Sequence, residues 1–305
     1  LALATRVLEA VPPGARVVLL GDKDQLSAVE TGAVFAEISS DPDLLPVTWL
    51  TTSHRFPEHS AIGRFASAIR SGDADHALSW LEGNTDPQLS WQAKGSALEI
   101  AQRGYQPFLD ALAQDAGNVQ AAAAAFARFR VLCAVREGPQ GVEALNRQLT
   151  DHVRSVLRDA GRGEWYAGRP VMVLVNDYTM KLFNGDIGIT LPGPDGQLMV
   201  HFAESGGWRR VPPARMPRHE TAFALTVHKS QGSEFDEVLL VLPVQEAKVV
   251  TRELVYTGVT RARERVVVHA SAQALGAALR GMAARRSGLR DRIREALSSA
   301  PAVAD

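Results

Sequence analysis

The sequence lacks several features that would assign a protein to a special class. Its single cysteine, Cys133, excludes an internal disulfide and favours a reducing compartment, so we expect a cytoplasmic protein with a buried thiol in the apolar run VLCAV. No apolar run reaches the roughly 18 residues of a membrane span. The formal net charge is only −1, which excludes a broad basic field for nucleic acid and leaves local contacts.

The remaining composition is that of an ordinary globular protein. Hydrophobic residues make up 46% and charged residues 22% of the 305 positions, which is enough for about two compact domains. The first residue, Leu1, lies in a predicted helix over residues 1–10, so we expect the sequence to come from a longer protein.

A polar loop between two apolar strands is the most informative local pattern. Residues 221–227 and 237–242 have the β-branched and apolar runs of strands buried in a parallel sheet. The intervening HKSQGSE concentrates hydrogen-bond donors, and Gly232 allows a positive φ. Such a loop suits a phosphate or a ribose, or it is a solvated connection between two elements.

A second polar turn follows a predicted strand near the beginning of the sequence. Residues 16–20 are predicted as a largely apolar strand, and Gly21, Asp22 and Gln25 follow its carboxyl end, where open α/β sheets bind ligands. The Gln25 amide can orient a water or a γ-phosphate. Alternatively, Asp22 makes only an Asx turn before a helix over residues 33–39.

Two arginines stand at junctions of predicted elements. Arg55 follows a predicted strand at 47–51, and Arg261 lies near the end of a helical pattern at 251–262. The Arg55 guanidinium either reaches a phosphate across a cleft or has the usual role of a lone arginine, whereas the position of Arg261 by itself predicts only an ordinary role. That role is a surface salt bridge for Arg55 and a helix C-terminal cation for Arg261.

Helices and strands alternate through the rest of the sequence, apart from one segment. Helices are predicted at 57–70, 75–82, 96–115, 119–129, 139–159 and 271–297, with strands at 130–135 and 265–270. Trp80 and Trp91 are expected to pack rather than to stack on bases.

The exception is residues 169–215, where short strands separated by turn residues predict a small β-barrel. Arg209 and Arg210, with Trp208 alongside, either contact single-stranded DNA or protect a solvated barrel edge.

Four strings occur in the order of the motifs of one helicase superfamily. GDKDQLSAVETGAVF resembles motif III, LTTSHRF motif IV, TVHKSQGSEF motif V and LVYTGVTRARERVVV motif VI of superfamily 1 helicases, in the form carried by the RecD family, the alpha subunit of exodeoxyribonuclease V. NDYTMKLFNGDIG resembles the SH3-like subdomain inserted in the second motor domain of that family. The resemblance implies an α/β fold with a RecA-like parallel-sheet motor domain of the P-loop NTPase type and an inserted small SH3-like β-barrel.

The same resemblance implies domain limits. Residues 1–46 would be the C-terminal remnant of a first RecA-like domain, residues 47–162 and 217–297 a second one, and residues 163–216 the SH3-like insert.

The resemblance also assigns roles to individual residues, and none of them is a metal ligand. The residues implied to be catalytic are Gln25, Arg55 and Arg261. Those implied to bind nucleotide are Gly21, Asp22, Gly232 and Glu234. Those expected to contact DNA are Thr226, His228, Lys229, Ser230 and Gln231 and, from the basic pattern beside Trp208, Arg209 and Arg210.

The nucleotide-gripping motifs are missing from the sequence. It contains neither a GxxxxGK[ST] loop nor an Asp-Glu pair closing a Walker-B strand, so we expect this segment alone to be inactive. The parent would be an ATP- and Mg²⁺-dependent 5′–3′ DNA helicase in unwinding and recombinational repair, with single-stranded and duplex DNA as partners. It would work either alone or with other exodeoxyribonuclease V subunits. The alternative is a non-catalytic DNA-binding or complex-assembly module on a helicase fold.

Overall fold

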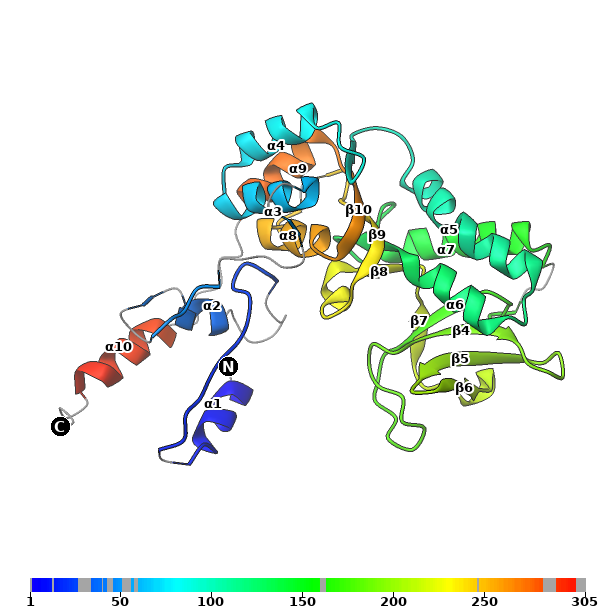
Figure 1. The fold of residues 1–305 in the computed structure, drawn as a ribbon, viewed down its shortest axis with the longest axis horizontal. Coiled ribbons are helices and arrows are strands. Elements are labelled where there is room, and N and C mark those ends of the chain that lie inside the picture. The colour runs from blue at the N-terminus through cyan, green and yellow to red at the C-terminus, as the bar shows by residue number, and fades with distance from the viewer. Residues whose placement is uncertain are drawn as a thin grey trace.

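A five-stranded parallel sheet lies at the centre of the fold (Figure 1). Its strands, in spatial order, are β1 (Leu89–Gln92), β10 (Ala262–His269), β9 (Phe235–Val241), β2 (Phe129–Cys133) and β8 (Ala224–Thr226). Every ladder between neighbours in this sheet is parallel, which confirms the predicted α/β fold with a parallel sheet. The structure is a computed structural model that describes residues 2–12, 14–26, 34–39, 41–42, 46–50, 56–57, 60–159, 163–245, 247–281 and 289–299.

Helices cover both faces of this sheet because alternate side chains of a central strand point to opposite faces. Val238 and Leu240 of β9 pack into one core, whereas Leu239 and Val241 pack into the other. The helices over the first core are α3 (Ala61–Ser71), α4 (Ala74–Gly83), α8 (Arg252–Val259) and α9 (Ala272–Arg280). Those over the second core are α5 (Ala97–Gln114), α6 (Val119–Arg128) and α7 (Val142–Val156).

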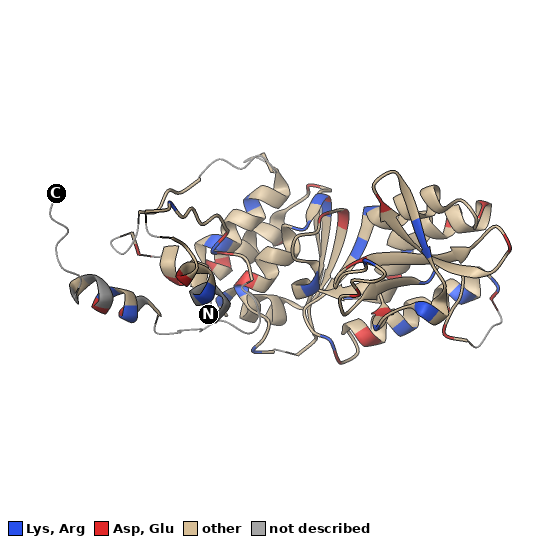
Figure 2. Cartoon of the chain, turned by 90° about the horizontal axis from the view of Figure 1, so that it is seen from below, with Lys and Arg blue, Asp and Glu red and all other residues tan. Residues whose placement is uncertain are grey.

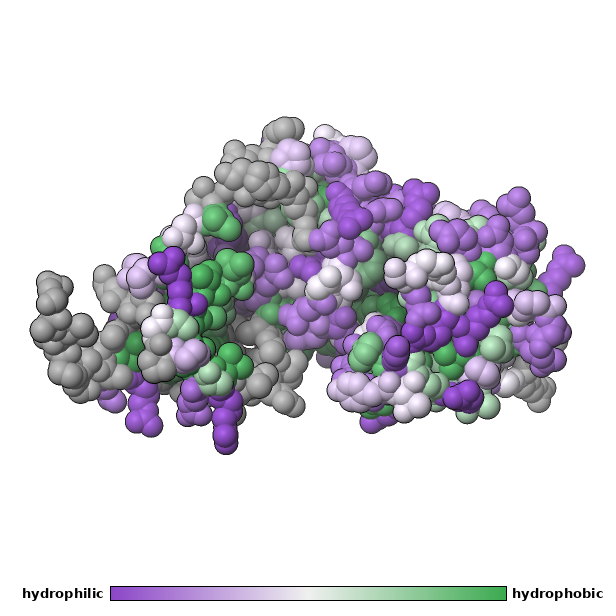
Figure 3. Space-filling model, turned by 60° about the horizontal axis from the view of Figure 1, so that its bottom comes forward, coloured by the Kyte–Doolittle hydropathy of each residue, from purple (hydrophilic) through white to green (hydrophobic). Residues whose placement is uncertain are grey.

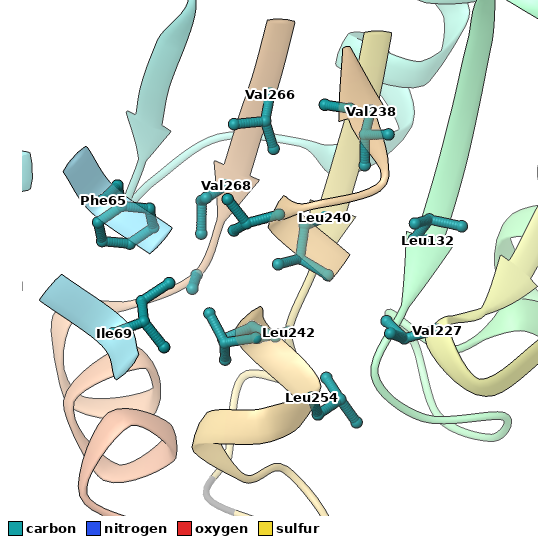
Figure 4. Close-up of a cluster of buried hydrophobic side chains, with 14 of the residues drawn as sticks. Phe65, Ile69, Leu132, Val227, Val238, Leu240, Leu242, Leu254, Val266 and Val268 are labelled. Carbon is teal, nitrogen blue, oxygen red and sulfur yellow. The ribbon is translucent and has the colours of Figure 1, made fainter. Parts of the chain in front are cut away.

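Polar caps set where the helices begin. Helix α3 starts after Ser60, whose hydroxyl accepts the Gly63 amide at 3.1 Å, and it directs Phe65 and Ile69 into the first core (Figure 4). Its first residue is therefore four positions later than the predicted start at Pro57. The side chains of Asp73, Ser96 and Asn118 cap α4, α5 and α6 in the same way, and these predicted helices are confirmed.

Three side chains singled out in the sequence have structural roles. Trp80 stacks on Phe65 with ring centroids 6.0 Å apart, and the Trp91 indole donates to the Ala270 carbonyl at 2.9 Å. Both packing predictions are confirmed. Cys133 is fully buried in β2, and burial raises the pKa of its thiol. The strand β1 was not predicted, because LSWQ is short and half polar.

A five-stranded antiparallel sheet lies beside the parallel one, to the right in Figure 1. Its strands, in spatial order, are β6 (Gly207–Val211), β5 (Leu198–Glu204), β4 (Ile187–Pro192), β3 (Pro170–Val173) and β7 (His219–Thr221). Its own core includes Val171, Val200 and Phe202, while Ile189 and Leu191 pack into the second core under α5 and α7. The short strands predicted at 169–215 are confirmed, and the sheet gains one further strand, β7, beyond Met216.

The single strand predicted at 221–227 is wrong, because this stretch divides between the two sheets. Thr221 ends β7 and Ala224 begins β8. Asn146 of α7 stabilises the break: its amide nitrogen donates to the Thr221 and Ala224 carbonyls at 2.8 and 3.0 Å, and its oxygen accepts the Ala224 amide at 2.8 Å. Phe223, between the strands, is fully buried, and its carbonyl accepts the Tyr105 hydroxyl at 2.5 Å.

The strands predicted at 16–20 and 47–51 do not form within the described residues. Both segments have no regular secondary structure and no ladder partners there, and Val18, Leu20 and Leu50 are 70%, 84% and 87% exposed. An apolar run becomes a strand only when a neighbouring strand pairs with it. Apolar residues therefore gather on the surface of this N-terminal region (Figure 3). The predicted helices at its two ends are confirmed as α1 (Ala2–Glu9) and α2 (Val34–Ser39).

The helix predicted at 271–297 is two helices. Helix α9 ends at Gly281, whose amide donates to the Ala277 carbonyl at 2.9 Å, and α10 (Leu289–Ser299) follows after residues 282–288, which are outside the described part. Two short 3₁₀ helices, η1 (Pro213–Arg215) and η2 (Val227–Ser230), complete the described elements.

Candidate functional site

Arg261 and Gln25 meet although 236 positions separate them in the chain. Arg261 lies two residues after the end of α8 and is only 3% exposed. Its guanidinium donates to the Thr257 and Ser233 carbonyls, each at 3.2 Å, and to the Gln25 side-chain oxygen at 3.1 Å. The end of α8 therefore fixes the guanidinium and aims one of its nitrogens at the N-terminal polar turn.

Asp22 organises that turn. One of its oxygens accepts the Asp24 amide at 3.0 Å, which is an Asx turn, and the other accepts the Gln25 amide nitrogen at 2.9 Å and the Tyr256 hydroxyl at 3.3 Å. Burial, together with the nearby Asp22 carboxylate, raises the pKa of Tyr256 to about 12. The Asx turn is therefore present, and the same carboxylate also orients Gln25.

An open cavity of about 850 Å³ lies against this cluster. Asp22, Gln25, Tyr256 and Thr260 form one part of its wall, and the rest comes mainly from α3 and α4, including Arg64, Arg70 and His76. Gln25 therefore lies between the buried Arg261 guanidinium and the cavity. The sequence reading missed Tyr256, although it stands five positions before Arg261 in the string LVYTGVTRA.

The polar loop after β8 begins as a tight 3₁₀ turn. Thr226 accepts the Lys229 amide through its hydroxyl at 3.3 Å, and the buried Ser230 hydroxyl donates to the Val227 carbonyl at 2.8 Å. Ser230 is therefore engaged inside the turn, with no exposed hydroxyl for a ligand. His228 and Lys229 are partly exposed on the same turn.

The end of this loop connects back to the N-terminal turn. The Gln231 side chain donates to the Leu26 carbonyl at 2.5 Å, and the Leu26 amide donates to the Thr257 hydroxyl at 2.8 Å. Gly232 has the positive φ of +81° that its residue type suggested. Glu234 pairs with Arg263, whose Nε lies 2.9 Å from the carboxylate. The loop and the N-terminal turn are thus joined directly, through Gln231 and Leu26, and indirectly through Arg261, which donates to both Ser233 and Gln25.

The two insert arginines differ in their surroundings. Arg209 donates to the Lys181 carbonyl at 2.8 Å, and it also contacts the Met180 carbonyl and the Glu204 carboxylate. It therefore fastens the connection between β3 and β4. Arg210, the next residue of β6, is exposed and opposite His201 of β5.

Arg55 and Gly21 are the remaining expected site residues. Arg55 lies outside the described residues. A Cβ atom at Gly21 would lie 3.0 Å from the Phe35 ring of α2, so a larger residue there would require that ring to shift. Among the described residues, no group of His, Cys, Asp and Glu side chains could hold a metal ion, and no helix is both long and apolar enough to cross a membrane. Lys and Arg are interspersed with Asp and Glu (Figure 2), which agrees with the near-zero net charge.

Family models match both ends of this arrangement. The model described as the UvrD-like helicase C-terminal domain matches residues 221–269, and the model described as an AAA domain matches residues 1–86. The chain is 42% identical over 298 residues to the RecBCD enzyme subunit RecD of Mycolicibacterium smegmatis, a match that covers 97% of this chain and 52% of the relative. The chain is therefore RecD-like.

Further relatives agree with this assignment. The RecBCD enzyme subunit RecD of Mycobacterium tuberculosis is 39% identical over 96% of this chain and 51% of its own length. The ATP-dependent RecD2 DNA helicase of Deinococcus radiodurans is 32% identical over 96% of this chain and 38% of its own length. The RecD-like chain corresponds to the C-terminal part and spans about half the length of the curated RecD subunits it matches.

Solved structures give a weaker likeness. The Pif1 helicase from Bacteroides in complex with ADP-AlF3 and single-stranded DNA is 18% identical, with a TM-score of 0.43, over 82% of this chain and 56% of that structure. The resemblance to the RecD family is therefore confirmed by the sequence relatives.

Proposed function

We propose that this RecD-like chain is the C-terminal motor part of an ATP-dependent 5′–3′ DNA helicase, that Gln25 faces the γ-phosphate of ATP, and that Arg261, held behind Gln25, acts on the same phosphate. The contact between these two residues beside the 850 Å³ cavity carries the proposal. A buried guanidinium held by backbone carbonyls is pre-positioned, and such an arginine stabilises the charge of phosphoryl transfer without reorganisation.

The chain would comprise parts of three domains. Residues 1–46 complete a first RecA-like domain, residues 47–162 and 217–297 form a second, and residues 163–216 form an SH3-like insert. The parallel sheet with helices on both faces supports the second domain, and the antiparallel sheet supports the insert. The exposed apolar residues at 17–20 support a remnant whose sheet neighbours lie elsewhere in a longer protein.

ATP and Mg²⁺ act only when this part is joined to a nucleotide-gripping half. Phosphoryl transfer needs a P-loop lysine and Mg²⁺ as well as arginines, and neither a P-loop motif nor, among the described residues, a cluster of metal ligands is present. On the triphosphate, this chain would contribute Arg261, Arg55 and Gln25, with Asp22 orienting Gln25. Gly21, Gly232 and Glu234 complete the nucleotide side.

DNA binds on the turn after β8. Thr226, His228, Lys229 and Gln231 would contact or position the backbone of a single strand, and Arg210 would extend the contact onto the insert. Ser230 holds the shape of the turn. Gln231 contacts Leu26, and Leu26 contacts Thr257 near Arg261. A DNA strand at this turn would therefore be connected to the nucleotide side through these two hydrogen bonds.

Partners of the whole protein are single-stranded and duplex DNA, in unwinding and recombinational repair. The relatives named RecBCD enzyme subunit RecD support further subunits, and the relative named ATP-dependent RecD2 DNA helicase supports the helicase activity.

The decisive experiment compares this chain with a longer protein that contains it and a P-loop. We expect the chain alone to show no ATP hydrolysis, and the longer protein to show DNA-stimulated hydrolysis and 5′–3′ unwinding. A longer protein that binds DNA but hydrolyses no ATP would instead be a non-catalytic DNA-binding or assembly module.

A further inference from the structure

Four charged side chains from neighbouring segments meet beside the η2 turn. Glu220 of β7 accepts the Lys229 ammonium at 2.5 Å through one oxygen and the Arg136 guanidinium at 3.0 Å through the other. Arg136 also donates through Nε to Glu143 of α7 at 2.9 Å. Two cations therefore face two carboxylates, and the cluster is electrically neutral.

The cations of this cluster are more open to solvent than the carboxylate that joins them. The side chains of Arg136 and Lys229 are 51% and 31% exposed, whereas that of Glu220 is 14% exposed. An anion from solvent can therefore reach both cations. The hydrogen bond to Glu220 and its negative charge are the main causes that raise the pKa of Arg136.

The neighbouring helix start does not offer a competing anion site. The first amides of α7 are already used, since Val142 donates to the Val135 carbonyl at 3.2 Å and Glu143 donates to the Arg136 carbonyl at 3.1 Å. The Glu143 carboxylate in the first turn also repels an anion. Binding strength for an anion at this point comes from the two cationic side chains.

We propose that Arg136 and Lys229 form a phosphate-binding pair for the backbone of a single DNA strand, and that Glu220 is an internal counter-ion which a strand phosphate displaces. The proposal rests on the DNA-binding role proposed above for the η2 turn. A phosphodiester presents two charged, unesterified oxygens and can bridge the two cations as the Glu220 carboxylate does.

This exchange has a mechanical consequence. Glu220 belongs to the antiparallel sheet, whereas Lys229 belongs to the turn that leads to the nucleotide cluster. When a phosphate takes the place of Glu220, a direct contact between the antiparallel sheet and the turn is replaced by a contact to DNA. Glu220 also competes with every phosphate that binds, so it lowers affinity and makes release of a moving strand easier.

Fluorescence anisotropy tests whether a strand phosphate displaces Glu220. A labelled oligothymidylate of about 15 nucleotides is bound to the 305-residue chain over a series of NaCl concentrations. We expect Glu220→Gln to bind about three- to tenfold more tightly at low salt, with a salt slope steeper by roughly 0.7 for each freed cation. Glu143→Gln is the matched control: it removes a carboxylate that contacts only Arg136 and leaves both Glu220 contacts, so any gain in affinity should be smaller than in Glu220→Gln. If the wild-type chain binds oligothymidylate and Glu220→Gln binds it with the same affinity, Glu220 is not a counter-ion that phosphate displaces. The proposed function would not be affected by that result.

A second variant covers the case in which Glu220→Gln disturbs folding. Lys229→Gln removes one cation on the exposed turn, and it should weaken binding and flatten the salt slope by roughly 0.7. Unchanged binding in Lys229→Gln overturns the phosphate pair.

Acylation of lysines, read by mass spectrometry, tests the pairing without DNA. We expect Lys229 to react several-fold faster in Glu220→Gln, while the exposed Lys94 reacts at an unchanged rate and serves as the internal control. Equal Lys229 rates in the two proteins overturn the internal counter-ion. If the wild-type chain binds no oligothymidylate although Lys229 becomes reactive in Glu220→Gln, the DNA role of the turn fails and the phosphate site fails with it.

Discussion

The Arg261 guanidinium donates to the side-chain oxygen of Gln25 at 3.1 Å and is buried behind it. The two residues belong to different sequence strings, and the contact connects the end of α8 with the N-terminal polar turn. Because Gln25 also lines the cavity, a change at the proposed γ-phosphate position would reach the guanidinium through one hydrogen bond. This arrangement fits a pair that senses whether the phosphate is present.

The first prediction concerns the arginine. In the longer protein, Arg261→Ala should lower kcat for ATP by roughly 10³–10⁵, because a positioned arginine stabilises charge that develops only in the transition state. DNA affinity should change little. Arg263→Ala is the matched control, since Arg263 is an exposed neighbour paired with Glu234, and its loss should leave kcat within a few-fold.

Thermal unfolding is measured on the same two variants. Arg261→Ala with normal turnover and lower stability would mean that the buried guanidinium only ties α8 to the Ser233 and Gln25 regions.

The second prediction separates two residues of one turn. His228→Ala should reduce DNA-stimulated ATP hydrolysis more than basal hydrolysis, because the partly exposed imidazole is placed where the strand is proposed to bind. Ser230→Ala should instead cost about 1 kcal/mol in stability, since its hydroxyl bonds inside the turn, and should leave stimulation by DNA intact. Equal loss of basal and stimulated rates in His228→Ala would argue against a DNA role for this side chain.

Much of the fold could be predicted from the sequence because it depends on local patterns. The apolar run of β9 and the polar caps of α4, α5 and α6 each determine their element through nearby residues. The division of residues 221–227 could not be predicted, since Asn146 and Tyr105, distant in sequence, provide its hydrogen bonds. The strand predicted at residues 16–20 does not form for a different reason: its apolar pattern is that of a strand, but no described strand lies beside it to form a ladder.

The candidate site shows the same limit. The strings identified Gln25 and Arg261 individually, and only the fold shows that they touch. Residue type alone also could not show that Lys229 is partly exposed and paired with Glu220 whereas its neighbour Ser230 is buried.

The third prediction is a pH dependence of stability. Burial raises the pKa of Tyr105 to about 12, so between its ordinary value near 10 and about 12 the unfolded chain loses a proton that the folded chain keeps. The folded state binds more protons in this window, and the free energy of unfolding therefore falls as pH rises. Tyr105→Phe should make this fall shallower by up to about 1.4 kcal/mol per pH unit.

Urea unfolding at a series of pH values measures the slope. The control is Tyr178→Phe, because Tyr178 is 77% exposed and should leave the wild-type slope unchanged. A Tyr105→Phe slope equal to that of the wild type would show that this hydroxyl does not hold its proton more tightly in the folded state.

The last prediction compares neighbouring arginines on β6. Arg210 is exposed, so Arg210→Ala should weaken binding of single-stranded DNA and reduce the slope of log affinity against log salt by roughly 0.7, as expected when one phosphate contact is lost. Arg209 instead fastens the β3–β4 connection through the Lys181 carbonyl, so Arg209→Ala should lower thermal stability and loosen that connection in hydrogen exchange. Salt-dependent anisotropy and hydrogen exchange on both variants distinguish the roles. A salt slope that falls in Arg209→Ala but not in Arg210→Ala would reverse the assignment, and unchanged slopes in both would remove the insert from the DNA path.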